Sequence, residues 1–536
     1  MADRATGSEK NKWRQQYREY LLPGLAVLVL LISCAIVSSK KYFWNDELLS
    51  FYLLDDRSFF HMLVAWSDKF NQAPPFYFIL GWVWDKLFGS TELPLRLFSS
   101  MTIGLACLTI WTVLRRTYDF WSTTIGTLSV FCLSELVLYH NAELRMYGLF
   151  TAVCAFGLLQ FDSINRNQKL SRKSLSINSI THGLIVLTHL YGVFYSTAIL
   201  GSFLIRDRYF KVFRINVYLS VLAGWIILIP LAPLIINQSN NSAKWFYAFT
   251  FPETINLLTP FTRFPSFMLA LFLIAALLFI VESGNNGITQ NDSLKQSSKI
   301  HLLILALSFI LVPITAWVIT VTLKPLLNDR YILPTIAIGW SILLTDLASR
   351  IIPESQQPKI IKGMIGKKFG FSVQWRSLIL FTLILVLILH PLYYAKKYSE
   401  YAQKPGKNDF RYGHLDLPIA MEAGHDFLPR FYYSSKPSRY FHILDLETAE
   451  KNVGSAYATG DYVHLNALSK NYPFIQSVQS SDFLNKYDRF LVMNEDDQKW
   501  FEWRVQNNPA YKVQKLGVEQ GANAPLTVFL VERQAK

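Results

Sequence analysis

Residues 21–47 read LLPGLAVLVLLISCAIVSSKKYFWNDE, an apolar run that leads into an acidic pair. The run from Leu21 to Val37 is long enough to cross the hydrocarbon core of a bilayer as one helix. The pair that follows is Asp46-Glu47, and a carboxylate is costly at the bilayer centre but not in the water beside it. The stretch therefore predicts a membrane helix followed by two carboxylates at the membrane surface, where a lipid-borne substrate can meet a water-borne one.

The composition is that of a polytopic membrane protein. Of the 536 residues, 51% are hydrophobic and 17% are charged, and apolar runs of spanning length recur along the chain. The net charge is +14, but Lys and Arg gather in short loops between apolar runs, which is the positive-inside pattern. We therefore expect membrane lipids, and not nucleic acid, among the partners. The four cysteines lie in apolar runs and indicate neither a disulfide nor a metal site.

Basic loops also assign the sides of the membrane, because Lys and Arg favour the cytoplasmic face. Basic residues precede the first run and follow the run 93–114. Only one net crossing then fits between Asp46, outside, and Arg115, inside. Residues 39–93 are therefore predicted to form one long external loop with amphipathic helices on the membrane, and the short apolar run Pro74–Phe88 belongs to it.

The same parity extends to the rest of the membrane region. The stretch 176–205 has basic flanks on both sides, so it must cross twice, with a turn near residues 188–191. About eleven transmembrane helices result, within a catalytic transmembrane domain of residues 1–395. The later helices are expected at 215–236, 265–282, 300–322, 331–348 and 377–395.

The tail, residues 396–536, differs in kind, since it is polar and aromatic. Strand-like runs are found at 439–444, 488–493 and 526–531, with helical stretches at 449–453 and 495–505 between them. This pattern predicts a mixed α/β domain, which the parity places on the extracytoplasmic side.

Asp46 is the first candidate catalytic residue on the predicted outer face. Transfer of a sugar to a hydroxyl or amine needs a base that takes the acceptor's proton, and one carboxylate suffices when the configuration inverts. A retaining mechanism would need a second carboxylate close by, which makes Glu47 a candidate as well. Alternatively, the acidic pair caps a short helix, Leu48–Leu54. The two interpretations are compatible.

A second cluster, His140–Tyr147, lies at the outer end of the fourth span. Arg145 can clamp a phosphate with two hydrogen bonds, and Glu143 can orient the acceptor or Arg145 itself. The alternative is an interfacial ion pair at a helix end. In the turn of 176–205, His189 and its neighbour Tyr191 can contact a phosphate oxygen, or the imidazole can satisfy backbone groups freed by the turn.

A third cluster has two cations in a predicted outer loop, Lys324 and Arg330, followed by Tyr331. The positive-inside rule disfavours cations there, so they suggest an anionic ligand such as a lipid phosphate, with a solvated loop as the alternative. The sequence has neither a Gly-rich phosphate loop after a strand nor a recognisable metal-binding spacing. No cofactor is therefore indicated, and participation of a divalent cation is left open.

Taken in order, these segments resemble the GT-C superfamily of polyprenol-dependent glycosyltransferases, in particular the protein O-mannosyltransferases and the lipid A aminoarabinose transferases. The resemblance covers roughly residues 20–350. It rests on an acidic pair in the first external loop, a Pro-Pro segment, the start of helix two, the start of helix four and a late Arg-Tyr pair. These are Asp46-Glu47, Pro74-Pro75-Phe76-Tyr77-Phe78, Pro94-Leu95-Arg96-Leu97-Phe98-Ser99, Glu143-Leu144-Arg145-Met146-Tyr147 and Arg330-Tyr331.

The resemblance implies that Asp46 is the catalytic base and that Arg145, Arg330 and Tyr331 contact the lipid phosphate. Arg96 and Tyr147, in the same segments, are further candidate substrate-binding residues. One position departs from the pattern, because many relatives have His or Lys directly before the Pro-Pro pair, where this chain has Ala73. A cation that relatives offer from this loop is therefore missing.

The sequence thus predicts an inverting membrane glycosyltransferase of the GT-C type. It would pass a sugar from a polyprenyl-phosphate carrier to a lipid, glycan or protein acceptor on the extracytoplasmic face, by default that of a bacterial inner membrane. The competing interpretation is a transporter or flippase of a lipid-linked sugar. A transporter would spread its charged residues through the bilayer depth, whereas here they gather at one predicted face.

Overall fold

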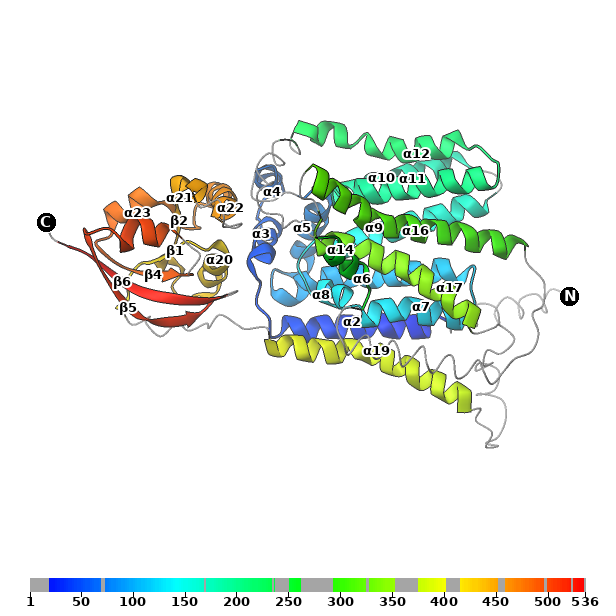
Figure 1. The fold of residues 1–536 in the computed structure, drawn as a ribbon, viewed down its shortest axis with the longest axis horizontal. Helices are drawn as coiled ribbons and strands as arrows, with labels where there is room; N and C mark the ends of the chain where they lie inside the picture. The colour runs from blue at the N-terminus through cyan, green and yellow to red at the C-terminus, as the bar shows by residue number, and fades with distance from the viewer. Residues whose placement is uncertain are drawn as a thin grey trace. The chain divides into compact units, whose positions relative to one another are not determined.

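The structure is a computed structural model in which the chain divides into two units (Figure 1). The helical unit comprises residues 1–37, 96–229 and 248–398, and the loop–tail unit comprises residues 38–95, 230–247 and 399–536. The two units are described separately below. The residues that the structure describes are 19–68, 73–167, 170–233, 236, 250–261, 293–323, 327–351, 375–401, 415–451, 458–495, 499–521 and 524–534.

The helical unit consists mainly of apolar α-helices. Among the described residues, six helical segments are long and apolar enough to cross a membrane, and a seventh results if the bent pair α7 and α8 counts as one span. The helices are α2 (Leu21–Ser38), α6 (Glu92–Arg115), α7 (Phe120–Leu133), α8 (Glu135–Asn141), α9 (Tyr147–Arg166), α10 (Arg172–Thr188), α11 (Gly192–Tyr209), α12 (Ile215–Trp225), α14 (Phe251–Leu258), α16 (Ser293–Thr322), η1 (Asp329–Ile332), η2 (Thr335–Trp340), α17 (Ser341–Ile351) and α19 (Trp375–Tyr401).

The chain is therefore a multi-pass integral membrane protein. The stretch 176–205, predicted to cross twice, consists of two helices, α10 and α11, with a break at residues 189–191. The predicted helix 265–282 lies outside the described residues, and the number of eleven spans stays a prediction. The bend of 65° between α7 and α8 falls at Ser134, whose extended backbone (ψ 119°) ends the first helix.

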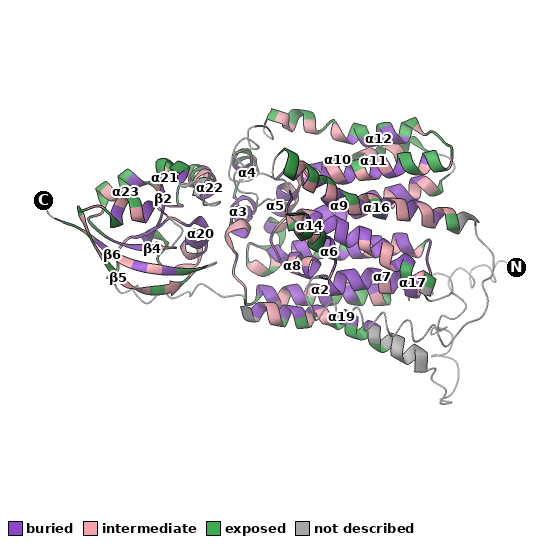
Figure 2. Ribbon diagram, viewed as in Figure 1, coloured by how far each residue is buried: buried purple, intermediate pink, exposed green. Residues whose placement is uncertain are grey.

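Small residues and buried ion pairs hold the helical unit together. Gly126 of α7 faces the backbone of Thr345 of α17, and Gly183 of α10 faces Gly224 of α12. Asp162 of α9 is fully buried and pairs with Arg166, one turn further along the helix, at 2.8 Å. Among the six candidate spans, α9 has the largest share of buried residues, which Figure 2 draws in purple. Close helix contacts of this kind are typical of membrane bundles, where apolar surface alone gives little specificity.

The loop part of the loop–tail unit carries three short helices: α3 (Asn45–Leu54), α4 (Phe59–Trp66) and α5 (Phe76–Phe88). At 13 residues, α5 is shorter than a spanning helix requires. The side chain of Ser58 accepts a hydrogen bond from His61 N at the start of α4, as expected of an N-cap serine.

The tail folds as a six-stranded mixed sheet with the strand order β3-β2-β1-β4-β6-β5. The first four strands in this order are parallel, and β6 and β5 are added antiparallel. Strands β1 and β2 are buried along their whole length, as expected of parallel strands covered on both faces. The strands are β1 (Ile419–Met421), β2 (Tyr440–Leu444), β3 (Ser477–Gln479), β4 (Arg489–Asn494), β5 (Tyr511–Gln520) and β6 (Pro525–Arg533).

Helices cover the sheet (Figure 1). One apolar core contains Phe483 of α23, Trp500 and Phe501, packed against Phe441 and Val492 of the sheet. The strands predicted at 439–444, 488–493 and 526–531 are confirmed as β2, β4 and β6, whereas β1, β3 and β5 were not predicted. The helices are α20 (Gly424–Tyr433), α21 (Leu446–Lys451), α22 (Ala458–Asn471), α23 (Ser480–Lys486), and the short turns η5 (Pro437–Arg439) and η6 (Glu502–Gln506).

Hydrogen bonds of Tyr433 and Tyr472 join the loop to the tail, and these contacts are called the seam below. The amide of Phe43 donates to the Tyr433 hydroxyl at 2.8 Å, and that hydroxyl donates to Glu92 at 2.7 Å. The Tyr472 hydroxyl donates to Asp56 at 2.9 Å. Segments about 400 residues apart in sequence thus form one folded unit.

Candidate active site

Asp46 and Glu47 occupy the first turn of α3, and the two carboxylates have different surroundings. Glu47 is fully buried, and its Oε2 accepts a hydrogen bond from the amide of Trp44, the residue before the helix, at 3.2 Å. This is the reach-back bond of a capping box. Asp46 is half-buried, and its backbone carbonyl accepts a hydrogen bond from the hydroxyl of Ser50. The capping role that the sequence left open therefore falls to Glu47.

The charge of Asp46 acts on a carboxyl group in the tail, that of Asp461. Helix α20 packs on α3, and burial raises the pKa of Asp461, on α22, to about 6. The negative charge of Asp46 contributes to this rise. Within the loop–tail unit, the proposed base therefore lies beside a buried acidic part of the tail.

A groove of about 600 Å³ also lies between α3 and the tail. Aromatic side chains dominate its lining, and apolar walls with a few polar groups are typical of small-molecule sites. The lining residues are Phe51, Tyr52, Asp55, Phe431, Tyr432, Pro437, Ser438, Phe474 and Gln476.

In the helical unit, four predicted site residues form an aromatic cluster, which comprises Tyr147, His189, Tyr191 and Tyr331. The rings of His189 and Tyr331 have centroids 4.6 Å apart, and those of Tyr191 and Tyr331 are 4.9 Å apart. The ring of Tyr147 lies 5.9 Å from that of His189. These side chains come from the start of α9, the α10–α11 turn and η1, so the fold brings together three segments that the sequence keeps apart.

Two arginines place positive charge at this aromatic cluster. The guanidinium of Arg330 lies 6.0 Å from the centre of the Tyr147 ring, within the range of a cation–π interaction. Burial lowers the pKa of the His189 imidazole, in the turn outside the helices, to about 3, and the charges of Arg145 and Arg330 contribute to that fall. His189 is thus neutral, and the cluster combines cations with hydroxyl and imidazole groups, as a phosphate site requires.

Glu143 and Arg145 lie next to this aromatic cluster along the chain. Glu143 is 1% exposed and pairs with Nδ1 of His140, whose ring lies 4.8 Å from that of Tyr147. The carbonyl of Arg145 accepts a hydrogen bond from Ser99 of α6, and α6 also carries the fully buried Arg96. Of the other candidates, Lys324 lies outside the described residues.

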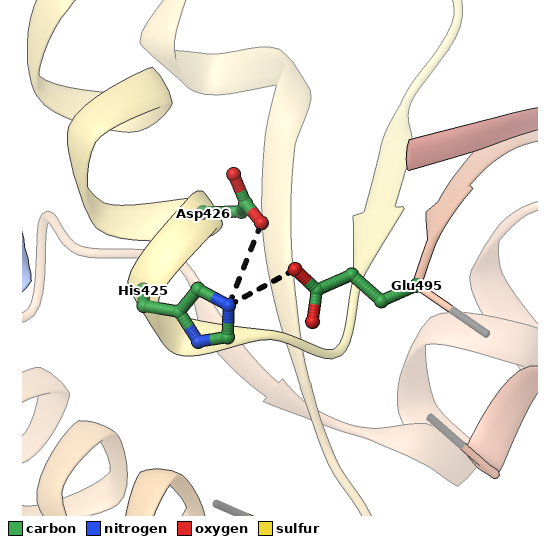
Figure 3. A group of neighbouring side chains, drawn as sticks. All are labelled: His425, Asp426 and Glu495. Carbon is green, nitrogen blue, oxygen red and sulfur yellow. Dashed lines mark hydrogen bonds and ion pairs between the residues drawn. The ribbon is translucent and has the colours of Figure 1, made fainter. Parts of the chain in front are cut away.

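One group was missed by the sequence analysis. His425 and Asp426 of α20 and Glu495, directly after β4, bring their side chains together in the tail (Figure 3). Nε2 of His425 lies 3.1 Å from Glu495 and 3.6 Å from Asp426. The neighbouring pair His425-Asp426 is visible in the sequence, but its partner comes 70 residues later and has no motif around it.

Comparison with solved structures identifies proteins that have a similar fold. The chain matches two crystal structures of ArnT from Cupriavidus metallidurans: the apo form, with a TM-score of 0.56 at 11% identity, and the form bound to undecaprenyl phosphate, with a TM-score of 0.54 at 12% identity. The chain has the GT-C fold. The matches cover 95–96% of this chain and 97–98% of ArnT. The GT-C likeness therefore includes the tail, which the sequence resemblance did not reach.

A weaker match, with a TM-score of 0.45 at 13% identity, is to the archaeal oligosaccharyltransferase AglB from Archaeoglobus fulgidus, and covers 87% of this chain and 69% of that one. No protein-family model and no curated protein sequence matches this chain.

Proposed function

We propose that this protein is an integral membrane glycosyltransferase that moves a sugar from a polyprenyl-phosphate carrier to an acceptor on the extracytoplasmic face. The observation that carries the proposal is the assembly of Tyr147, His189, Tyr191 and Tyr331 from three distant segments, with positive charge from Arg145 and Arg330 beside them. The fold supports it, since ArnT, which shares this fold, has been crystallised with undecaprenyl phosphate.

In the proposed reaction, the acceptor's hydroxyl or amine attacks the anomeric carbon of the sugar as the bond to the phosphate breaks. Asp46 takes the proton from the attacking group, and the lipid phosphate leaves with the bonding electron pair. Arg145 and Arg330 stabilise the negative charge that develops on the leaving phosphate. Lys324 is a further candidate for this role. A single displacement inverts the configuration at the anomeric carbon.

The proposal assigns unequal roles to the two carboxylates of α3. Glu47 accepts the bond that starts the helix, so its contribution is to hold Asp46 in place. Asp46 is half-buried and its carboxylate is the better candidate for the base. Glu143, paired with His140, is the candidate for orienting Arg145 or the acceptor.

The decisive experiment uses purified protein, a panel of radiolabelled polyprenyl-phosphate sugars, and the Asp46→Asn variant beside the wild type. Loss of a general base is expected to slow transfer by about 10²–10⁴-fold while the donor still binds. The exposed carboxylate of Asp482, in the tail, provides the matched control as Asp482→Asn. Full activity of Asp46→Asn would remove it as the base and turn attention to Glu47 and Glu143. Binding of a lipid-linked sugar by the wild type without any transfer would favour transport.

A further inference from the structure

The parallel part of the tail sheet has a topological switch point between β1 and β4. The chain runs from β1 to β2 and then β3 on one side, and β4 then pairs on the other side of β1. The connections after β1 and after β4 therefore lead away from each other at the carboxyl ends of these strands. In open α/β sheets, ligands bind at such a switch point.

The side chains at this switch point are of types that bind metal ions. His425 and Asp426 follow β1 in the first turn of α20, and Glu495 directly follows β4. All three are nine-tenths or more buried, at 9%, 3% and 4% exposed. Figure 3 shows Nε2 of His425 directed at both carboxylates.

The spacing of the three ligand atoms matches a small divalent ion. Zinc bonds of 2.0–2.2 Å to nitrogen and oxygen imply about 3.3–3.6 Å between neighbouring ligands of a tetrahedron. The distances from Nε2 of His425 are 3.1 Å to Glu495 and 3.6 Å to Asp426. All three ligand atoms lie within 4.8 Å of one another, so small movements of the two carboxylates would complete one face of a tetrahedron.

The charges around the three side chains also favour a cation. Asp461 of α22 accepts the amide of Gly424, one residue before His425, at 2.7 Å, and the charge of Asp46 on α3 acts on Asp461. Three carboxylates, those of Asp426, Glu495 and Asp461, thus act on the imidazole of His425. Three buried carboxylates around one imidazole carry an excess of negative charge, which a bound cation would offset.

We propose that His425, Asp426 and Glu495 bind a divalent transition-metal ion, zinc by the fit of the ligands, at the switch point of the tail sheet. An imidazole ligand favours zinc over calcium or magnesium, which prefer all-oxygen sites. Three protein ligands leave a fourth position for water or for another group. The site joins α20 to the end of β4. It stands on the fold of the tail and does not depend on the proposed transferase activity.

The test is metal content. Full-length protein in detergent is stripped with a chelator, equilibrated with zinc chloride, desalted and measured by plasma mass spectrometry. The wild type is expected to hold about one zinc ion per chain, with affinity at least tenfold lower in His425→Gln and Glu495→Gln. The exposed Glu450 on α21 provides the matched control as Glu450→Gln, which is expected to bind as the wild type does. A wild type that retains no zinc, or folded variants that retain as much as the wild type, would overturn the proposal.

A second measurement covers variants that fail to fold. X-ray absorption by the zinc-loaded wild type is expected to show only nitrogen and oxygen ligands, at about 2.0–2.2 Å. Sulfur ligands at about 2.3 Å would instead assign the zinc to cysteines and overturn the site. Both measurements are independent of glycosyl transfer, so an inactive enzyme leaves them valid.

Discussion

The imidazole of His189 and the phenol ring of Tyr331 lie with their centroids 4.6 Å apart, which joins the α10–α11 turn to η1. This contact orders the segment that carries Arg330, whose guanidinium then faces the ring of Tyr147. The aromatic rings thus act as a frame that holds a cation at a fixed place.

Replacement of that cation should weaken donor binding. A hydrogen bond to a charged group contributes about 1.5–3 kcal/mol, so Arg330→Gln is expected to lower affinity for a polyprenyl phosphate by about 10–150-fold. The exposed Arg208, at the end of α11, gives the control Arg208→Gln. The affinity is measured with the sugar-free lipid phosphate. Equal affinity in the two variants would remove Arg330 from the donor site.

Substitutions of the two acids of α3 should have different effects on activity and stability. Gln can make the same reach-back bond as Glu in a capping box, so Glu47→Gln is expected to keep transfer within a few-fold of the wild type. Glu47→Ala loses that bond and should lower the free energy of unfolding by about 1 kcal/mol. Activity assays and thermal melts of both variants check this. A Glu47→Gln enzyme as inactive as Asp46→Asn would show that Glu47 takes part in the chemistry.

The hydroxyl of Tyr433 should matter more than its ring for joining the loop to the tail. Tyr433→Phe leaves the buried amide of Phe43 without its acceptor, which costs about 1–3 kcal/mol. Hydrogen exchange in residues 42–54 is expected to speed up accordingly. Tyr432→Phe, whose ring keeps its edge contact with Phe51, is the control. Unchanged exchange in Tyr433→Phe would contradict the proposed role of the seam.

In the helical unit, Gly126 should tolerate no side chain. A methyl group there would lie 2.6 Å from Cα of Thr345, so α7 and α17 would have to separate. Overpacking of this kind costs about 1–3 kcal/mol, and Gly126→Ala is expected to melt earlier in detergent. Gly201, on α11, has open space around it and gives the control Gly201→Ala. Equal melting temperatures would mean that the two helices can move apart freely.

The tail should lose stability in acid through His442. Burial lowers the pKa of this imidazole, which contacts Ser477 and the carbonyl of Glu422, from 6.5 to about 3. Between these values the unfolded chain binds a proton that the folded chain does not, so stability is full above pH 6.5 and falls as the pH drops.

The slope attributable to this one group is about 1.4 kcal/mol per pH unit. His442→Asn is expected to flatten the pH dependence by that amount, measured as hydrogen exchange of β2 and β3 between pH 7 and pH 4 and corrected for intrinsic rates. Parallel pH profiles of wild type and variant would assign the acid sensitivity to other groups.

The sequence predicted an element correctly where a continuous run of residues has the composition typical of that element. The hydrophobic run Leu21–Val37 and the strand-like apolar run 526–531 needed nothing beyond length and composition, and they became α2 and β6. Strands β1 and β3, of three residues each, are too short for any periodic pattern to be visible. Charge parity grouped His189 with Arg330, and the structure places both beside Tyr147.

What the sequence could not show are relations between distant segments. Nothing near Phe43 indicates that its amide is bound by Tyr433, and nothing near His425 indicates Glu495, because these pairs arise only when the tail folds. The division of labour between Asp46 and Glu47 likewise depends on which carboxylate turns back toward Trp44, which a composition rule for helix starts does not resolve.

The seam between loop and tail has a consequence for the synthesis of the protein. The ribosome makes Phe43 almost 400 residues before Tyr433, and translation at about 5–20 residues per second separates their appearance by roughly 20–80 seconds. During that interval the segment bearing Asp46 is without the partner on which it packs. A nascent or truncated chain therefore carries an unsupported α3, and the site proposed for the base is completed only when the last part of the chain has been made.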